Sequence, residues 1–207
     1  MLNKITKSKL IIFSAPSGAG KSTLIKNIIE KGNGDIELSI SATTRPSREG
    51  EEHGRDYFFI SDEEFNKLKD SDSFIEHANV HGYQYGTLKS FVHEKIQNGI
   101  SIILDIDVQG FNLIKKSMEH NLSIFIIPPS ITELRKRLIS RGLDSSDVIE
   151  KRLTNARTEL KFAKQYDYIV LNDIFENTLN ELVSIIYDEN YEYNKKTYTN
   201  LLKDLLD

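Results

Sequence analysis

Two kinds of hydrophobic pattern alternate along the chain. Largely apolar runs, typical of parallel strands covered on both faces, occupy residues 10–13, 100–106, 122–127 and 168–171. Between them, apolar residues recur at helical spacing and predict amphipathic helices: Leu24, Ile25, Ile28 and Ile29; Leu88, Phe91, Val92 and Ile96; Leu134 and Leu138; Val148, Ile149, Leu153, Ala156 and Leu160; and Leu179, Leu182, Val183 and Ile186. This alternation predicts an α/β fold with a central parallel sheet flanked by helices and right-handed crossovers.

Residues 41–87 interrupt this rhythm. The segment is rich in Thr, Arg, Gly, Tyr and Phe, with short strand-like pieces such as residues 57–60. We expect a small inserted lobe with a mixed or antiparallel sheet. The polar tail, residues 191–207, contains a few leucines and predicts either an extension of the last helix or a short separate helix. With no internal repeat or linker in the sequence, residues 1–207 are expected to form a single domain.

The composition is that of a folded globular protein, with 207 residues, 39% apolar and 28% charged. The net charge of −4 gives no basic excess, which argues against general nucleic-acid binding. The chain has no cysteine, so disulfides and cysteine-based metal sites are excluded. No apolar run approaches the length of a membrane span, so we expect a cytoplasmic protein with no membrane partner.

A glycine-rich segment at residues 15–22, APSGAGKS, fits the spacing of a phosphate-binding loop (P-loop), with Ala15 where the strict pattern has glycine. A strand pattern precedes it and a helix pattern follows, which is the context the motif requires. Gly18 and Gly20 let successive N–H groups point at an anion. Lys21 can reach the β- and γ-phosphates of ATP, and the hydroxyl of Ser22 can bind Mg²⁺. The alternative is a chance match in a Gly/Ser-rich turn, and the motif alone does not name the acceptor.

Residues 41–51, SATTRPSREGE, form the second informative stretch. Arg45 and Arg48 flank Pro46 and suit bidentate contacts to a phosphate. Tyr57 and Tyr85 can add hydroxyl donors. On composition alone, however, a solvated loop whose arginines are balanced by nearby glutamates is the better interpretation.

Together with further blocks, this stretch resembles the GMP-binding region of guanylate kinases. The blocks are GRDYFF at 54–59, FIE at 74–76, YGT at 85–87 and ILDIDVQG at 103–110, in the family's order and at its approximate spacing. The resemblance extends from residue 10 to about 186 and is far more specific than the P-loop alone. It implies the P-loop nucleotide-kinase fold, with core segments 8–40, 88–128 and 164–190, a GMP-binding lobe at 41–87 and a helical lid at about 129–163.

The resemblance also implies a role for individual residues. Those expected to bind GMP are Ser41, Arg45, Arg48, Tyr57, Glu76, Tyr85, Thr87 and Asp107. Those expected to bind ATP are Ala15, Pro16, Ser17, Gly18, Ala19, Gly20, Lys21, Ser22, Thr23, Arg137, Arg141, Asn172 and Asp173. The catalytic set is Lys21, Arg45, Arg48, Arg137, Arg141 and Arg152, and the Mg²⁺ set is Ser22 with Asp105 acting through water.

The chemistry of guanine supports the roles that the resemblance assigns to these residues. Guanine presents N1–H and N2–H₂ donors on one edge, and a carboxylate such as that of Glu76 accepts both. Adenine has an acceptor at N1 and would leave the carboxylate unpaired, which is how a site rejects the wrong base. Taken singly, Glu76 could equally be an exposed carboxylate at a strand end, and each lid arginine a solvated helix residue.

The resemblance therefore implies transfer of the γ-phosphate of ATP to GMP, and to dGMP, with Mg²⁺, by a monomer or homodimer. The rival hypotheses are a kinase for another monophosphate, a non-catalytic guanylate-kinase-like interaction module, and a GTP-binding switch. The chain contains no Asn-Lys-x-Asp motif of the kind such a switch uses to recognise guanine.

Overall fold

The computed structural model describes residue 5 and residues 7–80, 82–115, 121–140, 142 and 144–206. Its central sheet has five parallel strands in the order β2-β7-β1-β8-β9. The strands are β1 (Leu10–Ser14), β2 (Ile36–Leu38), β7 (Ser101–Asp105), β8 (Asn121–Ile127) and β9 (Tyr168–Leu171). The predicted parallel α/β core is confirmed.

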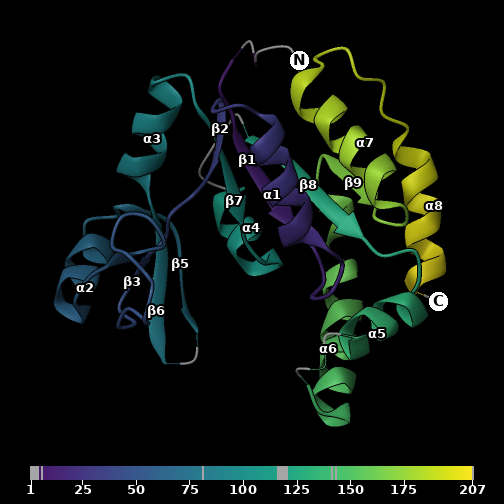
Figure 1. Cartoon of the computed structure of the whole chain (residues 1–207), viewed down its shortest axis with the longest axis horizontal. Coiled ribbons are helices and arrows are strands. Elements are labelled where there is room, and N and C mark those ends of the chain that lie inside the picture. Colours follow the sequence, from purple (N-terminus) through teal and green to yellow (C-terminus); the bar gives the residue numbers. More distant parts are fainter. Residues whose placement is uncertain are drawn as a thin grey trace.

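Successive side chains of a strand point to opposite faces of the sheet, so the strands contribute to two separate hydrophobic cores. Leu10 and Ile12 of β1 lie on one face, which is covered by α3 (Lys89–Gln97), α4 (Val108–Ile114), the end of α6 (Ser146–Leu160) and α8 (Lys195–Leu206). Ile11 and Phe13 lie on the other face, beneath α1 (Lys21–Lys31) and α7 (Phe175–Tyr187) (Figure 1). Helices on both faces explain why these strands are almost wholly apolar.

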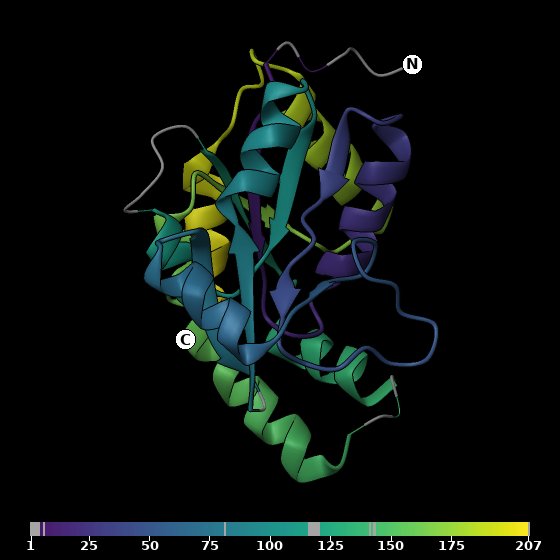
Figure 2. The same cartoon turned by 90° about the vertical axis from the view of Figure 1, so that its left-hand side faces the viewer.

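The inserted segment folds as a separate lobe with a four-stranded mixed sheet in the order β4-β3-β6-β5. Its elements are β3 (Ala42–Thr43), β4 (Phe58–Phe59), α2 (Asp62–Asp70), β5 (Phe74–Val80) and β6 (Tyr83–Leu88). Stacking of Phe65 on Phe74, with ring centroids 4.5 Å apart, joins α2 to the sheet. Figure 2 shows the lobe in front of the core, with the lid helices below it.

The segment predicted to be the lid forms α5 (Ile131–Ser140) and α6. Glu133 N donates to Ser130 Oγ at 3.0 Å, one of the two hydrogen bonds of a capping box, and α5 begins between these residues. Leu134, Leu138, Ile149 and Leu153 form the core between the two helices. Val148, expected in that apolar stripe, is 41% exposed, because consecutive helix residues point in different directions and the adjacent Ile149, 7% exposed, takes the position facing α5.

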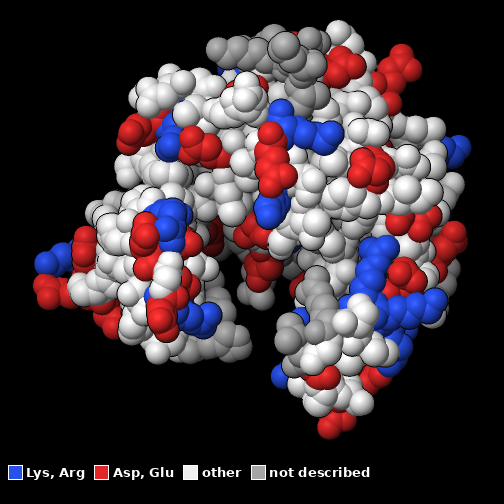
Figure 3. Space-filling model, in the orientation of Figure 1, with Lys and Arg blue, Asp and Glu red and all other residues white. Residues whose placement is uncertain are grey.

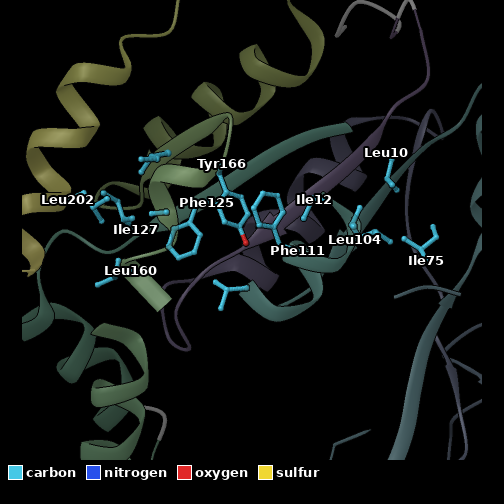
Figure 4. Packing of buried hydrophobic residues seen from close by; sticks show 14 of the residues in the cluster. Leu10, Ile12, Ile75, Leu104, Phe111, Phe125, Ile127, Leu160, Tyr166 and Leu202 are labelled. Atoms are coloured by element: carbon cyan, nitrogen blue, oxygen red, sulfur yellow. The ribbon is translucent and has the colours of Figure 1, made fainter. Parts of the chain in front are cut away.

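The polar tail forms a separate helix, α8, and docks on the sheet. Its Leu202 and Leu205 join the core around Tyr166, whose ring stacks on Phe111 with centroids 3.8 Å apart (Figure 4). Tyr193 Oη accepts from Ile169 N at 2.6 Å and donates to Ile169 O at 3.0 Å. The tail thereby covers the open edge of β9, where unpaired backbone groups would otherwise face solvent. None of the helices described is long and apolar enough to cross a membrane.

Candidate active site

The P-loop connects β1 to α1 and requires glycine at two positions. Gly18 and Gly20 have φ of 96° and 91°, in the left-handed region that other residues rarely adopt. A Cβ on Gly20 would come within 2.4 Å of Asn172 Nδ2. That amide donates to Ala19 O at 2.6 Å and so ties the loop to the end of β9. The N-terminus of α1 therefore opens onto a tightly folded loop, which is the geometry that holds phosphates.

Lys21 begins α1 and reaches across to the end of β7, where its ammonium forms an ion pair with Asp105. It also lies 3.5 Å from Ile106 O. Ser22, one residue further along α1, is exposed. A hydroxyl and a carboxylate beside a phosphate loop are the hard oxygen donors that Mg²⁺ prefers, so the residues present fit this ion.

The lobe carries a buried arginine at the predicted phosphate side. Arg45 is 8% exposed, and its Nη2 donates to both carboxylate oxygens of Glu51 at 2.8 and 2.9 Å. The guanidinium carbon lies 5.3 Å from the ring centroid of Tyr57 and 5.8 Å from that of Phe59. Tyr85 meets Tyr57 edge to face at 6.0 Å. The hydrogen bond to Glu51, with a smaller contribution from Tyr85, raises the pKa of Arg45, although burial opposes it, so the group stays charged.

Arg48 differs from Arg45, because its side chain is exposed while its main-chain N–H donates to Glu51 Oε2 at 2.8 Å. Arg48 and Arg45 thus share one carboxylate. The structure brings Arg45, Tyr57 and Tyr85 together and leaves the guanidinium of Arg48 in solvent at the edge of the same loop. The interpretation of this segment as a wholly solvated loop is wrong for Arg45, because aromatic rings and Glu51 enclose it.

The predicted guanine side lies on β5 and β6. Glu76 is paired with Thr87 across the two strands, and Thr87 Oγ1 donates to Glu76 Oε1 at 2.7 Å. Asp107 caps α4 by accepting from the N–H groups of Gln109 and Gly110 at 3.0 and 2.9 Å. Its Oδ1 makes both bonds, so Oδ2 is left for another donor.

Glu76 and Asp107 belong to the lobe and the core respectively, yet their charges interact. Burial raises the pKa of Glu76, the negative charge of Asp107 raises it further, and the hydrogen bond from Thr87 opposes both. Such a half-buried carboxylate near a second one suits a ligand that brings several N–H donors. Ser41 lies on the same lobe, where Ser41 O accepts from Phe58 N at 2.9 Å.

Two of the predicted lid arginines contact the core, one at the P-loop and one at the residue after β9. Arg152 Nη1 donates to Ser17 Oγ at 3.0 Å, and its Nη2 lies 3.3 Å from Asp144 Oδ1. Arg137 Nη2 donates to Asn172 O at 3.1 Å. Arg141 lies outside the described residues. The lid and the lobe extend from the same side of the core, and Figure 3 shows the surface deeply hollowed between them.

The structure also places residues that sequence reasoning did not single out. Asp144 and the contact between Ser17 and Arg152 could not be recognised from spacing, because each pairing depends on loop geometry. Of the glutamates expected to balance Arg45 and Arg48, the structure pairs Glu51 with both. The side chain of Asn172, predicted at the ATP site, is engaged with the P-loop main chain. Asp173 and Thr23 are exposed beside the site.

Comparison with known proteins agrees with this geometry. The family model described as guanylate kinase matches residues 7–189. The chain is 43% identical over 205 residues to a guanylate kinase of Photobacterium profundum, covering 98% of this chain and 99% of that one. It is 45% identical over 184 residues to a guanylate kinase of Polaromonas, covering 89% of each.

A solved structure gives the same result. The crystal structure of guanylate kinase from Anaplasma phagocytophilum matches with a TM-score of 0.65 and 33% identity, covering 93% of this chain and 90% of that one. A match to the family model over most of the chain, joined to the P-loop and the lobe described above, is decisive. The chain belongs to the guanylate kinase family.

Proposed function

We propose that the chain is an ATP:GMP phosphotransferase, which transfers the γ-phosphate of ATP to GMP and releases ADP and GDP. The observation that carries this proposal is the presence of two different candidate anion sites, one on the core and one on the lobe. The P-loop with Lys21 lies on the core, and buried Arg45 with Tyr57 and Tyr85 lies on the lobe. A donor and an acceptor phosphate can thus approach each other from opposite sides.

Guanine recognition is assigned to Glu76 and Asp107, supported by Thr87 and Ser41. Two acceptor carboxylates match the N1–H and N2–H₂ donors of guanine, whereas adenine would set its N1 lone pair against them. Neither carboxylate contacts the ribose in this assignment, so dGMP is expected as a second substrate.

The reaction is a direct displacement. An oxygen of the GMP phosphate forms a bond to the γ-phosphorus of ATP, the bond from that phosphorus to the β–γ bridging oxygen breaks, and ADP leaves with the electron pair. The acceptor phosphate is already ionised, so no general base is needed. Lys21 and the arginines Arg45, Arg48, Arg137, Arg141 and Arg152 offset the charge on the transferring group. Ser22, and Asp105 through water, would hold Mg²⁺, which would supply charge neutralisation and orientation of the ATP phosphates.

Closure of the lobe and lid over both substrates would exclude water, which otherwise could accept the phosphate and waste ATP. The site residues already sit on separate bodies, with Arg152 on the lid and Arg45 on the lobe, as such a closure requires. We expect this activity in the cytoplasm, from a monomer or homodimer.

A competition experiment tests the assignment. The protein is incubated with ATP, Mg²⁺ and an equimolar mixture of GMP, dGMP, AMP, UMP and dTMP, and the diphosphates are separated by chromatography. GDP and dGDP should be the nucleoside diphosphates formed from the acceptors. Comparable formation of UDP or dTDP would contradict the guanine site, and a folded protein that forms no acceptor diphosphate would favour the interaction-module hypothesis.

A further inference from the structure

Glu51 lies in the loop between β3 and β4, and its side chain accepts three hydrogen bonds from two donor nitrogens. Its two carboxylate oxygens accept from Arg45 Nη2 at 2.8 and 2.9 Å, and Oε2 also accepts from Arg48 N at 2.8 Å. Its own main-chain N–H donates to Arg48 O at 3.0 Å. One side chain therefore connects the two arginines assigned to the GMP phosphate.

The guanidinium of Arg45 is fixed in its plane by this contact. Nη1 donates to Pro46 O at 2.8 Å, and the rings of Tyr57 and Phe59 lie within cation–π distance. Glu51 engages the Nη2 group alone, so it leaves the Nε–H and the second hydrogen on Nη1, which point away from different edges of the guanidinium. Single hydrogen bonds from these groups to a phosphate are compatible with Glu51 staying in place, beside the contact that Arg45 makes with Tyr85.

We propose that Glu51 is a positioning residue for the acceptor phosphate: it remains bound to Arg45 and to the Arg48 main chain when GMP enters, and it orients Arg45 toward the phosphate. This inference rests on the proposed function. The inference adds Glu51 to the predicted GMP site. The carboxylate of Glu51 repels phosphate, so it can assist GMP binding only through the arginines that it contacts.

The opposite role, a substitute anion that leaves when GMP arrives, fits the contacts less well. A substitute would need to bind only the guanidinium. Glu51 instead closes a turn with Arg48 through both its main chain and its side chain, and its side chain is only 21% exposed. If the Glu51 side chain left Arg45, it would lose its two hydrogen bonds with Nη2. The turn with Arg48 would still keep its negative charge close to the bound phosphate.

Glu51→Gln separates the two roles. The carboxamide of glutamine has only one acceptor oxygen, and its NH₂ group would face one of the N–H groups that now donate to the carboxylate. Glutamine therefore cannot accept hydrogen bonds from both Arg45 and Arg48 in the way that Glu51 does. If Glu51 positions Arg45, the variant binds GMP worse although a repelling charge has gone. If Glu51 competes with the phosphate, the variant binds GMP better.

The experiment measures KM for GMP and for ATP in the full chain with Mg²⁺, with thermal unfolding to confirm the fold. Glu49→Gln is the matched control, because it removes the same charge from an exposed position of the same loop. For Glu51→Gln we expect KM for GMP to rise about tenfold or more, the size typical of a lost charge-assisted contact. KM for ATP should stay within about twofold, a split that a general loss of structure would not produce.

A double-mutant cycle with Arg45→Lys completes the test. Since Glu51 acts through Arg45, the combined loss should be smaller than the product of the single losses. An unchanged or lower KM for GMP in Glu51→Gln, equal rises for GMP and ATP, or an equal effect in Glu49→Gln would overturn the inference. If Glu51→Gln does not fold, Glu51→Asp carries the test with the same expected split, because the shorter chain cannot span both partners. A wild-type protein that fails to use GMP would refute the proposed function instead.

Discussion

Replacing Glu76 by glutamine isolates the guanine-reading role that we assign to it. The carboxylate accepts from Thr87 Oγ1 at 2.7 Å and lies close enough to Asp107 for their charges to interact. In Glu76→Gln the amide oxygen can still accept one donor, but the NH₂ group then faces the other donor of guanine. The substitution preserves volume, so it changes the recognition chemistry with little effect on packing.

The magnitude follows from the hydrogen bonds at stake. A hydrogen bond to a charged group contributes about 1.5–3 kcal/mol, and the loss is felt in full where the partner is left unpaired. Since about 1.4 kcal/mol is a factor of ten, kcat/KM for GMP should fall roughly 10- to 150-fold. KM for ATP should stay within about twofold, because the P-loop lies on the core and Glu76 on the lobe.

The Glu76→Gln substitution should preserve or raise the stability of the protein although it lowers the activity. Burial raises the pKa of Glu76, so the fold favours its protonated form. The stability that this group contributes is present below its unfolded pKa and is lost as the pH rises through the raised folded value. At neutral pH the ionised side chain therefore destabilises the protein, and Glu76→Gln should have a melting temperature equal to or above that of the wild type.

The assay is steady-state ADP release with GMP varied at saturating ATP, and then with ATP varied, beside a thermal melt. Glu64→Gln, an exposed change on α2 of the same lobe, is the control. In the wild type, KM for GMP should rise as the pH falls, and the rise should begin at a higher pH than protonation of a glutamate with an ordinary pKa would produce. The Glu76→Gln variant should lack the part of this rise that comes from protonation of Glu76. The phosphate of GMP titrates equally in both proteins, so their difference isolates Glu76. Equal losses for GMP and ATP, or full GMP activity in the variant, would refute the reasoning.

Three further substitutions test other parts of the structure. Lys21→Ala should lower kcat about 100-fold or more while the protein keeps its circular dichroism spectrum, as expected for a group that stabilises transferred charge; near-normal turnover would remove Lys21 from the mechanism. Gly20→Ala should weaken binding of a fluorescent ATP analogue, because its Cβ would meet Asn172 Nδ2 at 2.4 Å and its φ is 91°; unaltered affinity would show that the loop adapts. Tyr193→Phe should lower the free energy of unfolding by about 1–3 kcal/mol by leaving the main chain of Ile169 unpartnered, whereas exposed Tyr83→Phe should not; equal unfolding curves for the two variants would contradict that bond.

The core could be predicted from the sequence because its signals are local. The run at residues 168–171 coincides with β9, and the helical spacing of Leu134 and Leu138 coincides with α5. The P-loop was recognisable because glycine, lysine and serine occur there at a fixed spacing between a strand and a helix. Each of these features is decided by residues within a few positions of one another.

The lobe could be predicted only in outline, because its structure depends on distant pairings. β3 and β4 have two residues each, and β3 lies between β4 and β6, which come later in the chain. Propensity carries no information on that order. Burial of Arg45 likewise depends on Tyr57, Phe59 and Glu51, which the fold brings around it. The ligand contacts assigned to the site residues stay predictions, since they need the substrates in place.

The most direct test of the central claim is a coupled ADP-release assay with purified protein, ATP and Mg²⁺, started by adding one monophosphate at a time. Our account predicts negligible ADP without an acceptor, rapid release on addition of GMP, and one GDP formed for each ADP. ADP release that proceeds at the same rate without GMP, or with AMP in its place, would contradict the claim that this hollow joins ATP to GMP.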